Sequence, residues 1–495
     1  MKRSYLSEGQ LTPQKVVQLL ENGKVANLPL KDGAGKMNLK PKTTWANASG
    51  TTSSNNCTIT FFDDTRALQT ITDNYNLKMR VVKVAEDFAI TLNPIYQQGQ
   101  SRMLFPFKRS DTEIMFVSKT NSGWSYELIF VTIDANDNLT IETVPLFTPA
   151  QSLSENEMTL HIIQVEGTQN DFILCSQYTS GALNFVMLPF RVEGRAVTLG
   201  NIFVHDPAYY GNSPSNIAMW DVGKIALYHV NTLSNQSPLM STFAINDLTI
   251  TLLYRDTYPN SELGTTLISR FFMQKLSKGR IVLNYADPQT VGTPQVLRIV
   301  EFDKRTGKPI FASKRTIVAN SKAVSTPAFT MLVTAENVGF SYGKMNANST
   351  DPFYNKGTFW AWGADGDEFI MAPYLIFDDG ASTDMTQKYP SYSLNKSRTK
   401  ALISFIALNS FAVNIRAIEV VEQQHVGKVL GVAESTSTIA LSGVVNGFQG
   451  LVPGSEYVYD MNGNIAAIDK VYSQNKPIGR AINSNSLLMY DYLLK

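Results

Sequence analysis

Short apolar or alternating runs, separated by polar turns, fill the chain from about residue 56 to residue 421. The clearest example is EIMFVSKTNSGWSYELIFVTIDANDNLTIETVPLF, residues 113–147, in which ANDN (135–138) joins two such runs. Alternation of apolar and polar positions is typical of strands, and short Asn- and Asp-rich segments between two runs are typical of hairpin turns. This part of the chain is therefore predicted to be almost entirely β.

One arrangement of strand, tight turn and strand recurs along this region. The second strand of each copy begins near residues 113, 172, 224, 280, 338 and 400. The spacing is roughly 52–62 residues, and four strands per unit at such a period are typical of a propeller blade. Radial stacking lets each sheet bury both faces against its neighbours. We predict an all-β fold with a six- or seven-bladed β-propeller, and a string of β-sandwiches is the alternative.

Closing such a ring requires a partner for its last strands. The last copy lacks a clear fourth strand after residue 422. The hairpin LKMRVVKVAEDFAITL, residues 77–92, lies before the first copy and is predicted to supply that strand.

The beginning of the chain carries the signals of a helix. In TPQKVVQLLENGK, Thr12 suits the N-cap, Pro13 the first helical position and Gly23 the stop. Val16 and Val17 belong to an apolar face of this segment. We therefore predict a short amphipathic helix, which at this length needs a surface to dock on.

A polar segment, ANASGTTSSNN (residues 46–56), follows and is typical of a linker. The chain is thus expected to have three parts. These are an extended N-terminal arm with the short helix (1–55), the propeller (56–424) and a small C-terminal β module (425–495).

Composition excludes several classes of partner. Charged residues make up 17% of the chain and the formal net charge is +1, so no overall field attracts nucleic acid or an anionic membrane. The N-terminus has two basic residues but no apolar run after them, so no signal peptide is expected. No stretch approaches the ~18 apolar residues of a membrane span. We expect a product made in a cytoplasm, with no nucleic-acid partner and no membrane insertion.

The sequence offers little chemistry. Cys57 and Cys175 lie far apart and outside any metal-binding spacing, so they are expected to be free, partly buried thiols. The four histidines are scattered, and His161 and His229 fall within apolar runs that predict core positions. The carboxylates of GADGDE (363–368) do not have EF-hand spacing and fit a hairpin turn. We predict no catalytic residue, no cofactor and no metal site.

A glycoside hydrolase on this fold would need carboxylates in several innermost strands. Asp221, at the end of NIAMWD, is the only inner-strand carboxylate that we can place. Aromatic residues in expected loops are candidates for stacking on sugars or anchoring a protein interface, although capping of blade edges is an equal alternative. These candidates are Tyr209, Tyr210, Tyr354 and Tyr389.

The last 70 residues follow a different pattern from the repeats. A Gly-Val-Ala strand, a Gly-Leu-x-Pro-Gly-x-x-Tyr segment, an x-x-Gly-x-Ile turn and an Ile-Gly-x-Ala strand occur in this order. The segment at 426–495 resembles the small C-terminal module of many tailed-bacteriophage fibre and other virion proteins. The matching residues are Gly431, Ala433, Gly450, Pro453, Gly454, Tyr457, Gly463, Gly479 and Ala481. Pro453-Gly454 also predicts a type II turn, and Asn462-Gly463 a type I′ hairpin.

The resemblance implies a structural component of a tailed-phage particle: a fibre, tail or capsid-associated appendage. Its location would be the virion, and its partners other virion proteins and further copies of itself. Contact with a host surface glycan or protein is left open. The alternatives are a carbohydrate-active propeller enzyme and a cellular adhesin or scaffold.

Overall fold

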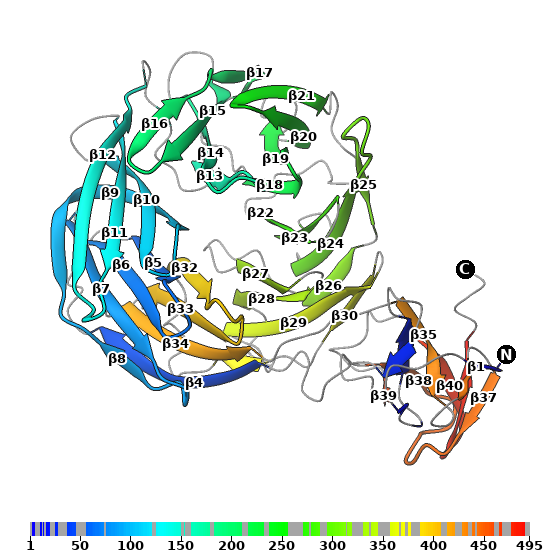
Figure 1. Ribbon diagram of the computed structural model, residues 1–495. Coiled ribbons are helices and arrows are strands. Elements are labelled where there is room, and N and C mark those ends of the chain that lie inside the picture. The colour runs from blue at the N-terminus through cyan, green and yellow to red at the C-terminus, as the bar shows by residue number, and fades with distance from the viewer. Residues whose placement is uncertain are drawn as a thin grey trace.

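The computed structural model shows a ring of sheets with a small domain beside it (Figure 1). It describes residues 2–4, 10–11, 13, 16–19, 25–27, 37–45, 56–73, 76–120, 125–149, 153, 160–178, 183–209, 216–231, 237–255, 271–276, 279–287, 295–312, 314–318, 330–335, 338–344, 357–365, 368–371, 375–377, 387–406, 413–420, 428–433, 438–440, 443–459, 465–467 and 477–490. Every regular element among them is a strand, and none of them forms a helix that could cross a membrane.

The strands of the ring divide into seven antiparallel four-stranded units, called blades 1–7 below. Blades 1–3 contain β5 (Asn56–Phe61), β6 (Arg66–Asp73), β7 (Asn76–Val84) and β8 (Ile90–Leu92); β9 (Tyr96–Lys108), β10 (Glu113–Thr120), β11 (Tyr126–Ile133) and β12 (Leu139–Phe147); and β13 (His161–Gln164), β14 (Asp171–Gln177), β15 (Leu183–Glu193) and β16 (Ala196–Leu199). Blades 4 and 5 contain β18 (Asn216–Asp221), β19 (Lys224–Asn231), β20 (Ser237–Asn246) and β21 (Thr249–Arg255); and β22 (Phe271–Lys275), β23 (Arg280–Ala286), β24 (Gln295–Phe302) and β25 (Pro309–Phe311). Blades 6 and 7 contain β27 (Thr330–Ala335), β28 (Val338–Lys344), β29 (Gly357–Asp365) and β30 (Glu368–Met371); and β32 (Gln387–Leu394), β33 (Lys400–Ile406), β34 (Val413–Val420) and β4 (Met37–Trp45).

Several blades have an outer edge made of two segments. β17 (Phe203–Tyr209), β26 (Arg315–Val318) and β31 (Leu375–Phe377) each pair with the third strand of their blade beside its fourth strand. In blade 1 the beginning of β9 has this place, because it pairs with β7 before β9 continues into blade 2. The two blades therefore form one sheet.

The repeat predicted from the sequence is confirmed by the strands. The predicted starts of the second strands agree to within a residue with those of β10, β14, β19, β23, β28 and β33. A charged residue begins most of these strands at the turn, and the apolar residues after it are buried. Glu113, for example, precedes Ile114, Met115 and Phe116, all of which have no exposed surface. The all-β propeller is therefore the fold of this chain.

The predicted closure of the ring is wrong. β4 pairs with β34 from Val413↔Trp45 to Val420↔Met37 and so supplies the fourth strand of blade 7. Residues 77–92 instead form the outer half of blade 1. They reach blade 7 by face-to-face packing, in a cluster that joins Val82 and Val84 to Ile415 and Ala417, and by a hydrogen bond from Lys400, but they add no strand to that blade. The first second strand of the predicted repeat starts at residue 113, so the repeat did not indicate blade 1, which precedes it.

The predicted N-terminal helix is also wrong. Val16–Leu19 is the strand β2, which pairs with β35 (Lys428–Ala433) and β3 (Val25–Asn27). Val16 and Val17 are buried there. β-Branched residues favour strands, and pairing with a distant strand outweighs local helix signals that are marginal at this length. The expected separate arm is therefore divided: β4 belongs to the ring, and the linker at 46–55 lies outside the described residues.

The small domain, called the terminal domain below, combines both ends of the chain. One sheet has the order β1 (Lys2–Ser4), β36 (Thr438–Ala440), β35, β2 and β3. The other has the order β37 (Gly443–Asn446), β41 (Ser486–Met489), β40 (Gly479–Asn483), β38 (Glu456–Tyr459) and β39 (Ile465–Ala467). Val16, Val432, Val445 and Leu487 belong to one hydrophobic cluster, so the two sheets share a core.

Candidate functional site

The innermost strands of the blades face the centre of the ring (Figure 1). In the described residues of β5, β9, β13, β18, β22, β27 and β32, the only carboxylate is Asp221. Asp221 lies at the turn that follows β18, where its Oδ2 is 3.6 Å from Lys224 Nζ. It has no second carboxylate beside it on these strands. Among the described residues there is also no group of three side chains that could hold a metal ion.

Neutral side chains join the inner strands of neighbouring blades. The Ile59 N–H donates to Ser391 Oγ at 3.0 Å, and the Val333 N–H donates to Gln274 Oε1 at 2.8 Å. An inner strand has an open edge, whose N–H groups need partners. These bonds supply partners from the preceding blade, so this part of the wall has a structural role.

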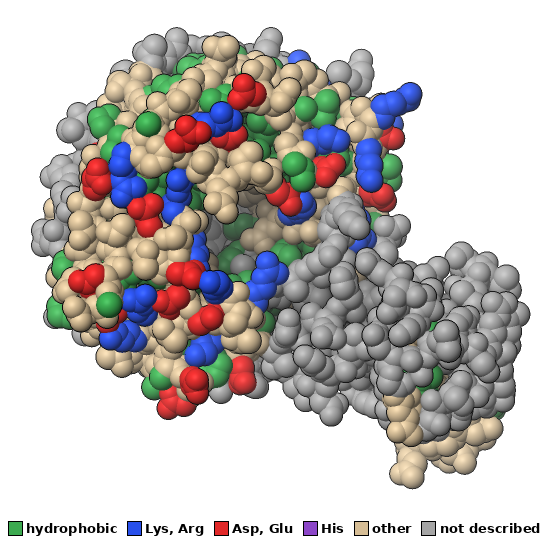
Figure 2. Space-filling view, viewed as in Figure 1, with side chains coloured by type: hydrophobic (Ala, Val, Ile, Leu, Met, Phe, Trp, Pro, Cys, Tyr) green, Lys and Arg blue, Asp and Glu red, His purple; other side chains and the backbone are tan. Residues whose placement is uncertain are grey.

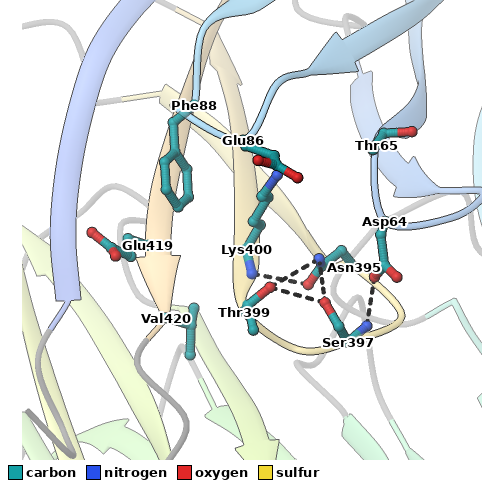
Figure 3. Close-up of a pocket in the computed structure, with 10 residues that line it drawn as sticks. All are labelled: Asp64, Thr65, Glu86, Phe88, Asn395, Ser397, Thr399, Lys400, Glu419 and Val420. Carbon is teal, nitrogen blue, oxygen red and sulfur yellow. Dashed lines mark hydrogen bonds between the residues drawn. The ribbon is translucent and has the colours of Figure 1, made fainter.

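A cleft of about 520 Å³ opens between the first and last blades (Figure 3). Its lining combines carboxylates, hydroxyl and amide groups, one ammonium and one aromatic ring. The lining residues are Asp64, Thr65, Glu86, Phe88, Asn395, Ser397, Thr399, Lys400, Glu419 and Val420. The volume lies within the range of small-molecule sites. This cleft is the candidate functional site.

The turn between β32 and β33 forms one wall of the cleft. Asn395 holds this turn, because its Oδ1 accepts the Lys400 N–H at 2.9 Å and its Nδ2 donates to Ser397 Oγ at 2.9 Å. The Ser397 N–H in turn donates to Asp64 Oδ1 of blade 1 at 2.6 Å. A backbone donor and a carboxylate thus connect the two walls across the closure of the ring.

Phe88 forms the opposite wall in an unusual backbone conformation. Its φ is +68°, which is uncommon for a bulky residue. The tight turn requires this conformation: the Phe88 N–H donates to Ala85 O at 3.1 Å, and the Ala85 N–H donates to Ala89 O at 3.0 Å. Lys400 Nζ donates to Ala85 O at 2.9 Å and lies 5.4 Å from the centre of the Phe88 ring. The ring and the ammonium are therefore held together at the cleft.

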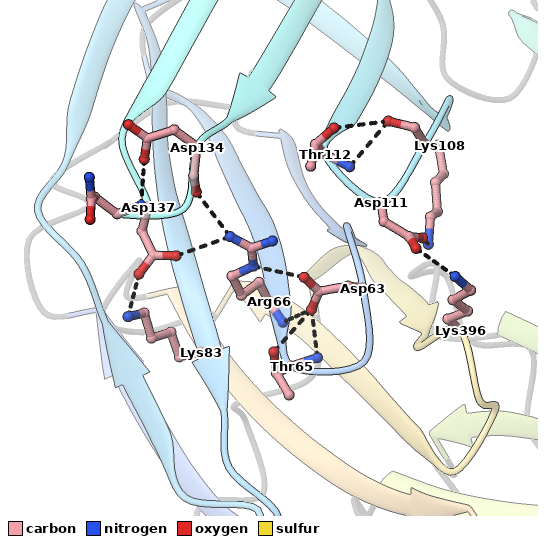
Figure 4. Close-up of polar contacts among 12 residues, drawn as sticks. Asp63, Thr65, Arg66, Lys83, Lys108, Asp111, Thr112, Asp134, Asp137 and Lys396 are labelled. Atoms are coloured by element: carbon pink, nitrogen blue, oxygen red, sulfur yellow. Dashed lines mark hydrogen bonds and ion pairs between the residues drawn. The ribbon is translucent and has the colours of Figure 1, made fainter.

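Ion pairs connect the turns around this site (Figure 4). Arg66 of blade 1 contacts Asp63 at 2.7 Å and Asp137 of blade 2 at 3.4 Å. Lys396 of blade 7 contacts Asp111 of blade 2 at 2.5 Å, across blade 1. Hydrogen bonds from Lys396 and then Lys108 lower the pKa of Asp111 to about 2. Ion pairs thus connect the turns of blades 1, 2 and 7 that border the cleft.

The charges of the ring are mixed in sign. Figure 2 shows acidic and basic side chains interspersed over the viewed face, and among the coloured residues neither sign forms a continuous surface. This arrangement agrees with the net charge of +1.

One histidine lies where the sequence predicts, and the two cysteines are more buried than the partial burial expected. Cys57 and Cys175 are not joined in a disulfide and are both buried; Cys57 Sγ donates to Ser404 O at 3.6 Å, and burial raises the pKa of Cys175 to about 12. His229 is fully buried, as predicted, whereas His161 is only half-buried.

The fold also brings together two histidines that the sequence separates. The Nε2 atoms of His205 and His229 lie 3.2 Å and 2.9 Å from Ser241 Oγ. Burial, and then the charge of Arg255, lowers the pKa of His205 to about 4. Burial also lowers the pKa of His229 well below its usual range, so both imidazoles are neutral near pH 7. They serve as polar core groups, and no local motif could have indicated their contact.

The candidate aromatic residues are only partly described. Tyr209 ends β17 opposite Leu183, and Tyr389 lies within β32, so neither belongs to a loop as expected. Tyr210 and Tyr354 lie outside the described residues. A binding role for these tyrosines stays a prediction.

The residues through which segment 426–495 resembles a virion module have particular backbone conformations and contacts in the terminal domain. The predicted type II turn at Pro453-Gly454 is confirmed, because Gly454 has φ +84° and the Ser455 N–H donates to Val452 O at 3.1 Å. Tyr457 is buried, and its hydroxyl accepts the Val452 N–H at 2.8 Å. The type I′ turn predicted at Gly463 lies outside the described residues.

The small residues of the motif permit close packing. A Cβ on Gly479 would lie 2.5 Å from Leu488 O. Ala481 is buried, and its carbonyl accepts the Gly454 N–H at 2.7 Å. Ala433 is buried opposite Ile439, Gly431 pairs with Val17, and Gly450 has φ +73°.

Comparison with known proteins assigns this chain to no family. No known family model matches the chain, and no curated protein matches it. Solved structures of similar fold include a core factor from S. cerevisiae (TM-score 0.45, 9% identity, covering 77% of this chain and 60% of that one). A second is a protein from Lactobacillus plantarum (TM-score 0.42, 11% identity, covering 78% of this chain and 98% of that one). A third is the β-propeller domain of the trilobed protease from Pyrococcus furiosus (TM-score 0.40, 9% identity, covering 74% of this chain and 99% of that one). The assignment of this chain as a β-propeller protein rests on its own strand pairing.

Proposed function

We propose that this chain is a non-enzymatic structural protein of a tailed-phage particle, used as a fibre, tail or capsid-associated appendage. The ring would form its body, and the terminal domain would attach it to other virion proteins or to further copies. One observation carries this proposal. The residues through which 426–495 resembles a virion module are those that its turn and close strand packing require, including Gly454, Tyr457 and Gly479.

Particle incorporation tests this function. A chain truncated after residue 424 keeps β4 and β34, so its ring should fold, and Gly479→Val should disrupt the terminal domain while leaving the strand pairing of the ring unchanged. We expect both variants to be soluble but depleted from purified particles, as measured by mass spectrometry against the full chain. Normal incorporation of both folded variants would refute the proposed role of the terminal domain.

We also predict that the purified chain has no glycosidase activity. Asp221 is the only carboxylate of the described inner strands and lies at a turn, whereas hydrolysis of a glycosidic bond uses a pair of carboxyl groups about 5–10 Å apart. We expect no turnover of a panel of chromogenic glycosides by the purified chain. Asp221→Asn should give the same background as the wild type. Turnover that this substitution abolishes would contradict the prediction.

The cleft supports a second role, contact with a host surface glycan. Its carboxylates and hydroxyls can bind sugar hydroxyls, and the Phe88 ring, beside Lys400, contributes an apolar group to the lining. We expect binding on a glycan array to fall by about tenfold or more for Phe88→Ala. Ile310→Ser, at an exposed apolar position on blade 5, is the matched control and should bind like the wild type. Equal binding by the two variants would exclude this site.

A further inference from the structure

Two buried histidines and one serine join blades 3 and 4. His205 comes from β17 of blade 3, and His229 and Ser241 come from β19 and β20 of blade 4. The exposed fractions of these three residues are 2%, 0% and 0%. Both Nε2 atoms lie within hydrogen-bonding distance of the Ser241 hydroxyl, and the centres of the two imidazole rings are 5.3 Å apart. One hydroxyl thus holds an imidazole from each blade.

The strand β17 is attached to the ring on two sides. Within blade 3 it pairs with β15, and among the described strands β15 is its only partner. On blade 4, the Phe243 ring lies 5.6 Å from the Phe203 ring and 5.2 Å from the His205 ring. Figure 1 shows β17 at the outer rim of the ring, close to β21 of blade 4. Edge segments can open locally without unfolding of the whole domain, so β17 can separate while the other blades stay folded.

Positive charge on the two imidazoles would destabilise this contact. Two imidazolium rings at this separation repel one another, and burial removes the water that would screen them. Arg255 is directly opposite Ser241 in the pairing of β20 with β21 and adds a third positive charge. The contact therefore requires neutral imidazoles.

The other titratable groups of the two facing sheets do not offset this charge. Asp171 and Asp247 bind Arg191 at the opposite end of the strands. Cys175 is buried and its pKa is raised to about 12, so its thiol stays neutral, and His161 opposite it is only half-buried. The remaining acidic residues lie at or beside turns and are at least partly exposed: Glu166, Glu193 and Asp221. Among the described side chains, none places a negative charge beside the two imidazoles.

We propose that β17 is an acid-sensitive clasp between blades 3 and 4. Protonation of both imidazoles makes them repel one another and Arg255. His205 then leaves its contact with His229, and β17 separates from blade 4 while the other blades stay folded. The separation uncovers the Phe243 ring, which is fully buried in the closed ring. This clasp does not depend on the proposed role in a particle.

The pH range of the clasp follows from the pKa values of its closed and open forms. In the closed form, burial and then the charge of Arg255 lower the pKa of His205 from 6.5 to about 4, and burial lowers that of His229 well below its usual range. In the open form both residues contact water, so their pKa values return towards about 6.5. The open form thus binds more protons, and the clasp is fully stable above about pH 6.5 and loses stability as the pH falls towards about 4. From about pH 7 to about pH 5, His205 alone should increase the opening equilibrium by about twentyfold.

Hydrogen–deuterium exchange of the full-length chain at about pH 7 and about pH 5, corrected for the intrinsic effect of pH on exchange, tests this clasp. Mass spectrometry of peptides should show that the protection of β17 falls by about tenfold or more on acidification. The protection of β10 in blade 2 should change by less than about twofold. A fall of equal size in both strands, or no fall in β17, would overturn the inference.

Three substitutions distinguish proton binding from a loss of packing. His205→Gln keeps a neutral polar group beside Ser241 and should remove about half of the acid response on a logarithmic scale. Arg255→Gln removes the neighbouring positive charge and should also reduce the response, whereas a variant that only loosened the packing would increase exchange at both pH values. His161→Gln is the matched control and should respond like the wild type. An acid response that is unchanged in both His205→Gln and Arg255→Gln would contradict the clasp.

Discussion

Replacing Met37–Trp45 with a glycine–serine linker of equal length should leave a ring that does not close. The replacement removes the whole pairing between β4 and β34, which extends from Val413 to Val420. It also uncovers the outer edge of the blade whose Ile415 and Ala417 pack against blade 1. We expect a loss of several kcal/mol, a large part of the ~5–15 kcal/mol by which domains are stable. Chemical denaturation and limited proteolysis would measure it.

The control for this replacement lies in the terminal domain. The same kind of linker in place of Lys2–Ser4 removes β1 but leaves the ring complete, so the unfolding of the ring should not change. A synthetic peptide of Met37–Trp45 should partly restore the stability of the ring that lacks β4. An unchanged unfolding midpoint in that ring would show that β4 does not close it.

Gly200→Ala adds one methyl group at the contact between blades 3 and 4, and no other single added methyl group there should destabilise the ring more. A Cβ at this position would lie 2.3 Å from Leu248 O and 2.8 Å from Pro189 Cγ. Backbone must then move, and we expect a loss of about 1–3 kcal/mol in the free energy of unfolding. Gly194→Asn is the control, because a Cβ there meets nothing within 4 Å and asparagine tolerates its φ of +58°. Equal losses for the two variants would contradict this packing.

The sequence was sufficient for the second strands of blades 2–7 because their signal is local. Each second strand, such as the one from Lys224, combines a turn, a charged residue and an apolar run within a few positions. The closure and the terminal domain were not predictable in this way. β2 and β4 acquire their state from β35 and β34, about 400 residues further along the chain, and local helix signals at Thr12 and Gly23 were outweighed by that pairing.

The candidate cleft was missed for the same reason. Asp64 and Ser397 meet across 333 positions of sequence, and they do so only because blade 1 follows blade 7 around the ring. Lys400 did carry a signal, since a charged residue recurs at the start of the second strands. Without the correct closure, however, its neighbours Ala85 and Phe88 could not be identified.

Because the chain is synthesised from its N-terminus, β4 is made long before β34, the strand with which it pairs. β4 leaves the ribosome before any blade is made, and its partner at Val413 follows about 370 residues later, roughly 20–70 s at translation rates of ~5–20 residues per second. During that time β4 has no strand to pair with and could be captured by nascent neighbours. Its centre, Lys40-Pro41-Lys42, discourages such encounters, because lysine and proline are poor partners at a strand edge. The same three residues lie where its register with β34 shifts, between Arg416 and Ile418. The tripeptide Lys40-Pro41-Lys42 thus both protects β4 from wrong pairing during translation and makes its final register with β34 irregular.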